Sequence, residues 1–66
     1  MNSENVIERE LHELPFGRLI KSQEIEHESG LKMLRLTIRE GRRFTLIDLD
    51  ESSAKKLSAD LSDWVK

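Results

Sequence analysis

The sequence predicts a small α+β domain, in which a three-stranded antiparallel β-meander packs against one C-terminal α-helix. Three observations predict it: β-rich runs lie on both sides of Gly30 and Gly41, both glycines suit hairpin turns, and apolar residues recur at helical spacing after Ala54. We expect residues 14–66 to form this single domain and residues 1–13 to be weakly structured or frayed.

The N-terminal segment is polar and ambiguous. Ile7, Leu11 and Leu14 have helical spacing, but the piece is short and rich in glutamate. Pro15 disfavours a helical conformation of Leu14, and Gly17 permits a turn, so a new element is expected from Arg18. An extra N-terminal strand is the alternative for this segment.

The first expected strand runs from Arg18 to Glu28, where the alternation of apolar and polar residues is imperfect, as is typical of an edge strand. A two-residue turn at Ser29 and Gly30 would place Ile25 opposite Leu34. The second strand, residues 31–39, alternates best and is expected to be central, with Leu34, Leu36 and Ile38 on one face.

The third expected strand, Arg43 to Leu49, follows a three-residue turn over residues 39–41 with Gly41 in the left-handed conformation. This register sets Leu36 opposite Phe44 and Leu34 opposite Leu46. Phe44 and Leu46 are then expected on the core face, whereas Ile47 and Leu49 point away from it.

The C-terminal element is expected to be an amphipathic helix that packs on the sheet. Asp50 is the expected N-cap, with Ser52 as the alternative, and Glu51 suits the positive end of the helix dipole. The residues of its apolar stripe recur at spacings of three and four: Ala54, Leu57, Leu61, Trp64 and Val65.

The second sheet face carries more apolar surface than one helix can cover, which predicts a non-catalytic protein-interaction module, with a homodimer or another protein bound there. The alternative is that residues 6–16 fold back over this face. The candidate interface residues are Ile20, Leu31, Met33, Ile47 and Leu49.

Four arginines on or near the second hairpin are candidates for binding anions or nucleic acid, since guanidinium groups bind phosphates in a bidentate manner. A small nucleic-acid-binding regulator is therefore the alternative function. The sequence favours a solvated hairpin, because Glu40 lies within the cluster and the formal net charge is -2. These arginines are Arg35, Arg39, Arg42 and Arg43.

Catalytic and metal sites are not expected. The chain has no cysteine, its two histidines are far apart, and the acidic group Asp48, Asp50 and Glu51 lacks the glycine turn of a calcium loop. No nucleophile has a positioned base, so neither an enzyme nor a cofactor is expected. The chain has no apolar run of membrane-spanning length and no signal-peptide pattern, so a cytoplasmic protein without membrane contact is expected.

The segments FGR, ESGLKMLRL and REGRRFTLIDLD, followed by a helix that bears a tryptophan, resemble a group of short bacterial proteins of unknown function. The resemblance covers residues 15–65. It implies a bacterial cytosolic protein and transfers no activity and no functional residues.

Overall fold

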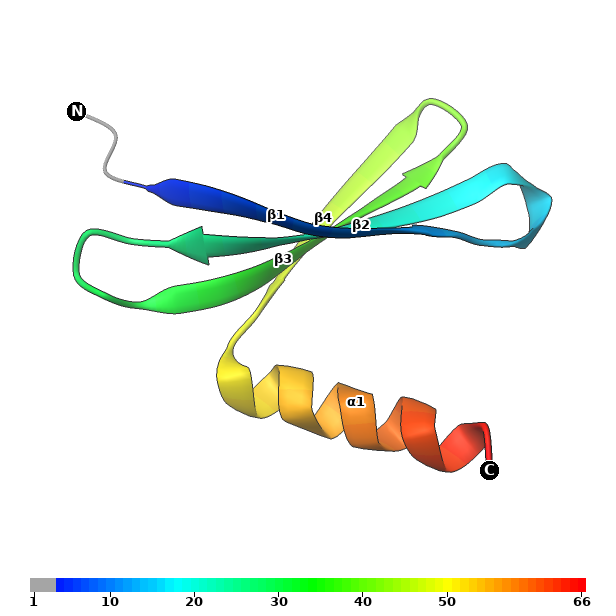
Figure 1. Cartoon of the computed structure of the whole chain (residues 1–66). Coiled ribbons are helices and arrows are strands. Elements are labelled where there is room, and N and C mark those ends of the chain that lie inside the picture. The colour runs from blue at the N-terminus through cyan, green and yellow to red at the C-terminus, as the bar shows by residue number, and fades with distance from the viewer. Residues whose placement is uncertain (1–3) are drawn as a thin grey trace.

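The fold is one four-stranded antiparallel sheet with a single α-helix beneath it (Figure 1). The structure, a computed structural model, describes residues 4–66. The α+β class predicted from the sequence is confirmed, but the meander has four strands instead of three. In chain order and in spatial order the strands are β1 (Asn5–Glu13), β2 (Arg18–Glu26), β3 (Lys32–Glu40) and β4 (Arg43–Leu49), and α1 spans Glu51–Trp64.

The N-terminal segment forms the first strand. Asn5–Glu13 pairs with β2 along its length, so the extra N-terminal strand is present and the expectation of weak structure is wrong for these residues. Residues 1–3, which that expectation also covered, lie outside the described part of the chain. β1 extends the sheet sideways. It does not fold over either face, so the alternative in which residues 6–16 cover the second face is wrong.

The turn between β1 and β2 matches the predicted break at Pro15 and Gly17. A short 3-10 turn spans Pro15–Gly17, and the Leu14 amide donates a 2.8 Å hydrogen bond to the Arg18 carbonyl. Phe16 has a φ of 66° and Gly17 a φ of 72°, so two successive residues adopt the left-handed conformation. That conformation is unusual for a bulky aromatic residue.

The hairpin between β2 and β3 differs from the predicted one by one residue. The His27 amide donates to the Leu31 carbonyl and the Gly30 amide to the His27 carbonyl, which closes a three-residue loop with Gly30 at a φ of 92°. This is the hairpin geometry in which a turn precedes a left-handed glycine. Ile25 therefore lies opposite Met33, and the predicted pairing with Leu34 is wrong.

The hairpin between β3 and β4 also corrects the predicted register. Glu40 pairs with Arg43, so the turn has two residues, and Gly41 with a φ of 62° occupies its first position, as a type II′ turn requires. Leu36 then lies opposite Ile47. Because side chains alternate between faces, this odd shift exchanges the two faces of β4, and the predicted pairing of Leu36 with Phe44 is wrong.

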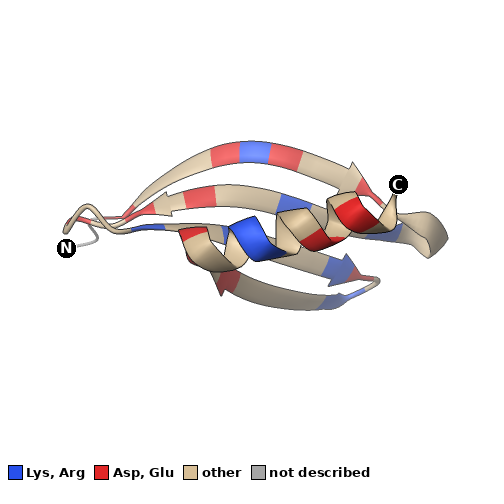
Figure 2. Ribbon diagram, turned by 90° about the horizontal axis from the view of Figure 1, so that it is seen from below, with Lys and Arg blue, Asp and Glu red and all other residues tan. Residues whose placement is uncertain are grey.

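The helix begins as predicted. The Asp50 side chain accepts a 2.7 Å hydrogen bond from the Ser53 amide, so Asp50 is the N-cap. Its acceptor satisfies one of the amides that have no partner in the first helical turn. α1 then runs back under the sheet, where its contacts are mainly with β3 and β4 (Figures 1 and 2).

The molecule is flat and extended for its size, with extents of 39 × 30 × 15 Å. Its radius of gyration is 13.4 Å, compared with about 10.8 Å for a compact domain of this length. Ile25 and Ser22 are the only buried side chains among residues 4–66. The core of the isolated chain is therefore very small.

Candidate functional site

One face of the sheet lies toward α1, and we call it the helix face. Glu24, Leu34 and Leu49 form one row across β2, β3 and β4, and with Ala54 of α1 they line a shallow hollow. Strand alternation places the rest of the set on this face. Its apolar residues are Ile7, Ile20, Leu34, Leu36, Ile38, Ile47 and Leu49.

The apolar residues of the helix face are incompletely covered. Five of the seven are only half-buried, and Ile7 and Ile47 are exposed. In a two-layer domain such a face is normally the centre of the core. The sequence predicted a helix that packs on the sheet. The helix does contact the sheet, but it leaves much of this face uncovered.

The apolar side of α1, which we call the helix stripe, is covered by the sheet only at its beginning. The stripe comprises Ala54, Leu57, Leu61, Trp64 and Val65. Ala54 is half-buried against the sheet, Leu57 is 40% exposed, Leu61 56% and Trp64 81%. Exposure thus rises from Ala54 to Trp64, and Val65, which follows the last residue of α1, is 71% exposed. The helix face and the helix stripe together form an apolar wedge that is closed at Ala54 and open at Trp64.

The opposite face of the sheet, which we call the open face, is polar in its centre. Arg35 donates two hydrogen bonds to Asp48, of 2.8 and 3.0 Å, from adjacent strands. On β1 and β2 Glu8 accepts from the Gln23 amide at 2.7 Å and pairs with Lys21 at 3.3 Å. This pattern is typical of a solvated face. Ile25 lies on the same face between its cross-strand neighbours Val6 and Met33, and it is only 1% exposed.

Three carboxyl groups are stabilised in their charged form. The bidentate Arg35 guanidinium holds the pKa of Asp48 below its usual value, and the same contact raises the pKa of Arg35. The hydrogen bond from Gln23, aided by Lys21, lowers the pKa of Glu8. Hydrogen bonding from the Ser53 side chain, and after it from the Ser53 backbone amide, lowers the pKa of the Asp50 carboxyl. Two of the three acids in the group Asp48, Asp50 and Glu51 therefore have structural partners.

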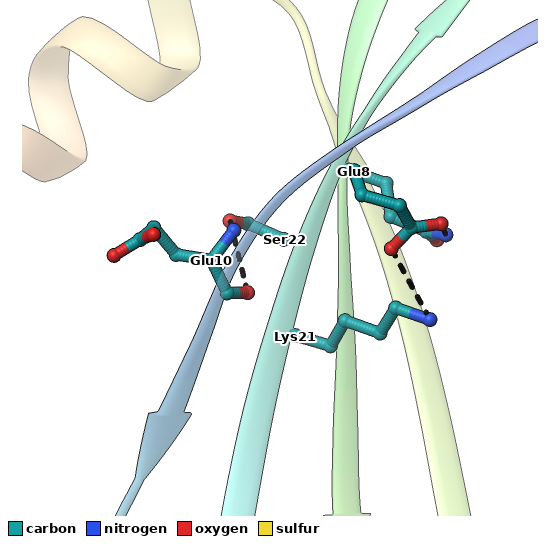
Figure 3. Close-up of polar contacts among 5 residues, drawn as sticks. Glu8, Glu10, Lys21 and Ser22 are labelled. Carbon is teal, nitrogen blue, oxygen red and sulfur yellow. Dashed lines mark hydrogen bonds and ion pairs between the residues drawn. The ribbon is translucent and has the colours of Figure 1, made fainter.

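The second polar feature is a β-bulge in β1 between Glu8 and Glu10. The Ser22 hydroxyl accepts a 3.2 Å hydrogen bond from the Glu10 amide and donates to the Glu10 carbonyl at 3.4 Å. Figure 3 shows this contact and the Glu8–Lys21 pair on opposite sides of the strands. Ser22 thus satisfies the backbone groups that a bulge leaves unpaired, which explains why it is buried.

The predicted interface residues do not share one face. Ile20, Ile47 and Leu49 lie on the helix face, Met33 lies on the open face, and Leu31 is exposed in the hairpin loop. The sequence placed the first three apart from Leu34, Leu36 and Ile38, whereas the structure brings all six together. The register of the two hairpins caused this difference.

The predicted arginine cluster is divided. Arg35 lies in mid-sheet with Asp48, whereas Arg39, Arg42 and Arg43 lie at the β3–β4 hairpin. Sequence reasoning missed that Arg18 joins this end, because β2 pairs Arg18 with Glu40, whose carboxylate lies 3.0 Å from the Arg18 Nε. The residues at this hairpin end are Phe16, Arg18, Arg39, Arg42, Arg43 and Phe44.

Each phenylalanine of the hairpin end has an arginine over its ring. The guanidinium carbon of Arg18 lies 5.9 Å from the Phe16 ring centroid, and that of Arg39 lies 5.7 Å from the Phe44 centroid. Phe16 is 90% exposed. Within residues 4–66 neither Arg42 nor Arg43 has an ion pair.

No group of histidine and acidic side chains among the described residues has the arrangement of a metal site. His27 lies 3.5 Å from a Glu4 carboxylate oxygen, and His12 is exposed on β1. No helix in the described part of the chain is long and apolar enough to cross a membrane.

A family model covers residues 4–66, from the residue before β1 to Lys66, and its description is "family of unknown function (DUF6967)". The chain belongs to this family. No curated protein matches the chain, and no solved structure does. The match agrees with the resemblance to proteins of unknown function and assigns no activity to any residue.

Proposed function

We propose that the chain is a non-catalytic interaction module that associates with a second copy of itself through the apolar wedge. One observation carries the proposal. The chain exposes 5741 Å² of surface, whereas a compact monomer of 7.7 kDa exposes about 4,300 Å². The excess of about 1,400 Å² exceeds the roughly 800 Å² that each partner contributes to a standard protein interface.

The composition of the wedge supports an interface with protein. Its apolar residues are aliphatic except for Trp64, a residue type that is enriched in interface cores. We infer a second copy as the partner, because a two-fold dimer uses the same surface on both subunits. Each copy would then cover the exposed apolar wedge of the other. Burial of this surface would also supply stability that the isolated chain lacks, since only two side chains are buried among residues 4–66.

The test compares two substitutions of the same residue type at equal exposure. Leu61 in the helix stripe is 56% exposed and Leu31 in the hairpin loop 57%. Leu61→Glu is expected to convert the dimer to a monomer in sedimentation velocity, whereas Leu31→Glu leaves it intact. Circular dichroism confirms that both variants fold. A dimer that persists in Leu61→Glu, or a wild type that stays monomeric, would refute the proposal.

The hairpin end supports a second candidate function, the binding of single-stranded nucleic acid. Two exposed rings lie at the same end of the sheet as four arginines, and Phe16 adopts a left-handed conformation that bulky residues rarely adopt. Aromatic rings that stack on bases, with cations for the backbone, are the usual means of binding single strands.

Fluorescence anisotropy with a labelled single-stranded oligonucleotide tests this candidate. Affinity is expected to fall as the salt concentration rises. It should also weaken in Phe16→Ala, which removes a stacking ring, and in Arg42→Ala, which removes a cation. Arg9→Ala on β1 is the control and should bind as the wild type does. Absence of binding at low salt would exclude the function.

A further inference from the structure

The two edges of the sheet are differently protected. β1 carries a bulge and the charged run Glu8, Arg9 and Glu10, which Figure 2 shows along the outer strand. Bulges and charges are the features by which edge strands avoid pairing with other chains. β4 has the sequence RFTLIDL, with no proline, no lysine and no irregularity in its register. β4 is therefore the edge that remains competent to pair.

The backbone of β4 offers a defined set of free groups. Because the two-residue turn closes with Glu40 and Arg43 as a hydrogen-bonded pair, the residues that bond toward β3 alternate along the strand from Arg43. Phe44, Leu46 and Asp48 then direct their backbone amides and carbonyls away from β3. These groups form a template for another strand.

The charges of β4 suit a second, antiparallel copy of the same strand. Arg42 and Arg43 lie at its beginning, and Asp48, Asp50 and Glu51 lie at its end. An antiparallel pair brings the basic end of each strand beside the acidic end of the other, whereas a parallel pair would oppose like charges. Charge complementarity therefore selects the two-fold arrangement.

We propose that two copies of the chain join through antiparallel pairing of their β4 strands, which forms one continuous eight-stranded sheet. In the register centred on Leu46, all three residues with free backbone groups find partners: Leu46 pairs with Leu46 of the second copy and Phe44 with its Asp48. Arg42 then faces Asp50 of the second copy. This inference rests on the proposed self-association and specifies its geometry.

The arrangement brings the two apolar wedges together. A two-fold axis through paired β4 strands runs perpendicular to the sheet, so both α1 helices lie on the same side. Since α1 contacts β3 and β4, each helix lies beside this axis. The exposed stripe of one helix, with Leu61 and Trp64, then meets the helix of the second copy, which accounts for the high exposure of these two residues in the isolated chain.

The absence of cysteine from the chain allows a direct test by disulfide formation. Leu46 on β4 and Leu11 on β1 belong to one row across the sheet, through Lys21 and Thr37. They are 57% and 61% exposed. In the proposed dimer the two Leu46 Cα atoms lie about 5.5 Å apart, whereas the two Leu11 positions are separated by seven strand spacings, about 34 Å.

Under mild oxidation Leu46→Cys is expected to form a covalent dimer rapidly, because its Cα separation lies within the range that a disulfide spans. Leu11→Cys should remain uncrosslinked. A mixture of Phe44→Cys and Asp48→Cys tests the register independently and is expected to give a crosslinked heterodimer. Circular dichroism and the mass of each variant under reducing conditions accompany the oxidation.

The outcomes separate this inference from the proposed self-association. A chain that is monomeric under reducing conditions and shows no crosslinks would overturn both. A dimer in which neither Leu46→Cys nor the mixed pair crosslinks, or in which Leu11→Cys crosslinks equally fast, would overturn the β4 pairing and leave the self-association in place. Selective crosslinking at β4 would support both.

Discussion

Replacement of Ile25 by valine should destabilise the protein far more than the same change at Ile7. Ile25 is 1% exposed, and Ile7, on the neighbouring edge strand, is exposed. Removal of one buried methylene from isoleucine costs about 1 kcal/mol, and truncation to alanine about 2–5 kcal/mol. A chain of 66 residues has a free energy of unfolding of about 3–10 kcal/mol, so Ile25→Val is tolerable and Ile25→Ala approaches complete unfolding.

Thermal unfolding followed by circular dichroism at one fixed protein concentration measures the effect, since self-association makes the melting temperature depend on concentration. A loss of 1 kcal/mol lowers the melting temperature of a domain of this size by roughly 4–8 °C. We expect Ile25→Val to fall in this range and Ile7→Val to shift by less than about 2 °C. Equal shifts in the two variants would refute the inference that the buried Ile25 contributes more to stability than the exposed Ile7.

The polar contacts give three further predictions. Asp50→Ala removes the N-cap of α1 and should lower the melting temperature by about 5 °C, whereas Asp50→Asn, which keeps an acceptor, should restore most of it in the same scan. Stability should decline in acid, because the pKa values of Glu8, Asp48 and Asp50 are lowered in the folded state. Their contribution to the free energy of unfolding is present above about pH 4.5 and is lost as the pH falls through the lowered values. Urea titrations from pH 7 to pH 2 would detect this loss. Asp48→Asn should reduce this acid sensitivity, and an unchanged pH profile in that variant would contradict the role of its pair with Arg35.

The elements of the fold were largely predictable, because they depend on local signals. The alternation in residues 31–39, the left-handed glycines and the Asp50 cap each act within a few residues, and the structure contains a strand, two hairpin turns and a capped helix at these places. β1 was harder to predict. Its Ile7, Leu11 and Leu14 suggested a helix, and the bulge that Ser22 stabilises disturbs the alternation that marks a strand.

The registers, and with them the composition of the faces, were not predictable from local signals. Gly41 can occupy the third position of a three-residue loop or the first position of a type II′ turn, and both are compatible with the sequence around it. The choice decides whether Ile47 or Phe44 shares a face with Leu36. Contacts between residues far apart in the chain, such as that of Arg18 with Glu40, depend on the same register and were missed for the same reason.

The central claim is that the apolar wedge is covered by a second copy of the chain. The most direct test is the solution mass of the wild type, measured by light scattering over a concentration series together with the melting temperature at each concentration. The account predicts a mass of twice 7.7 kDa at high concentration and a melting temperature that rises with concentration. A mass of 7.7 kDa at every concentration, with a constant melting temperature, would contradict it.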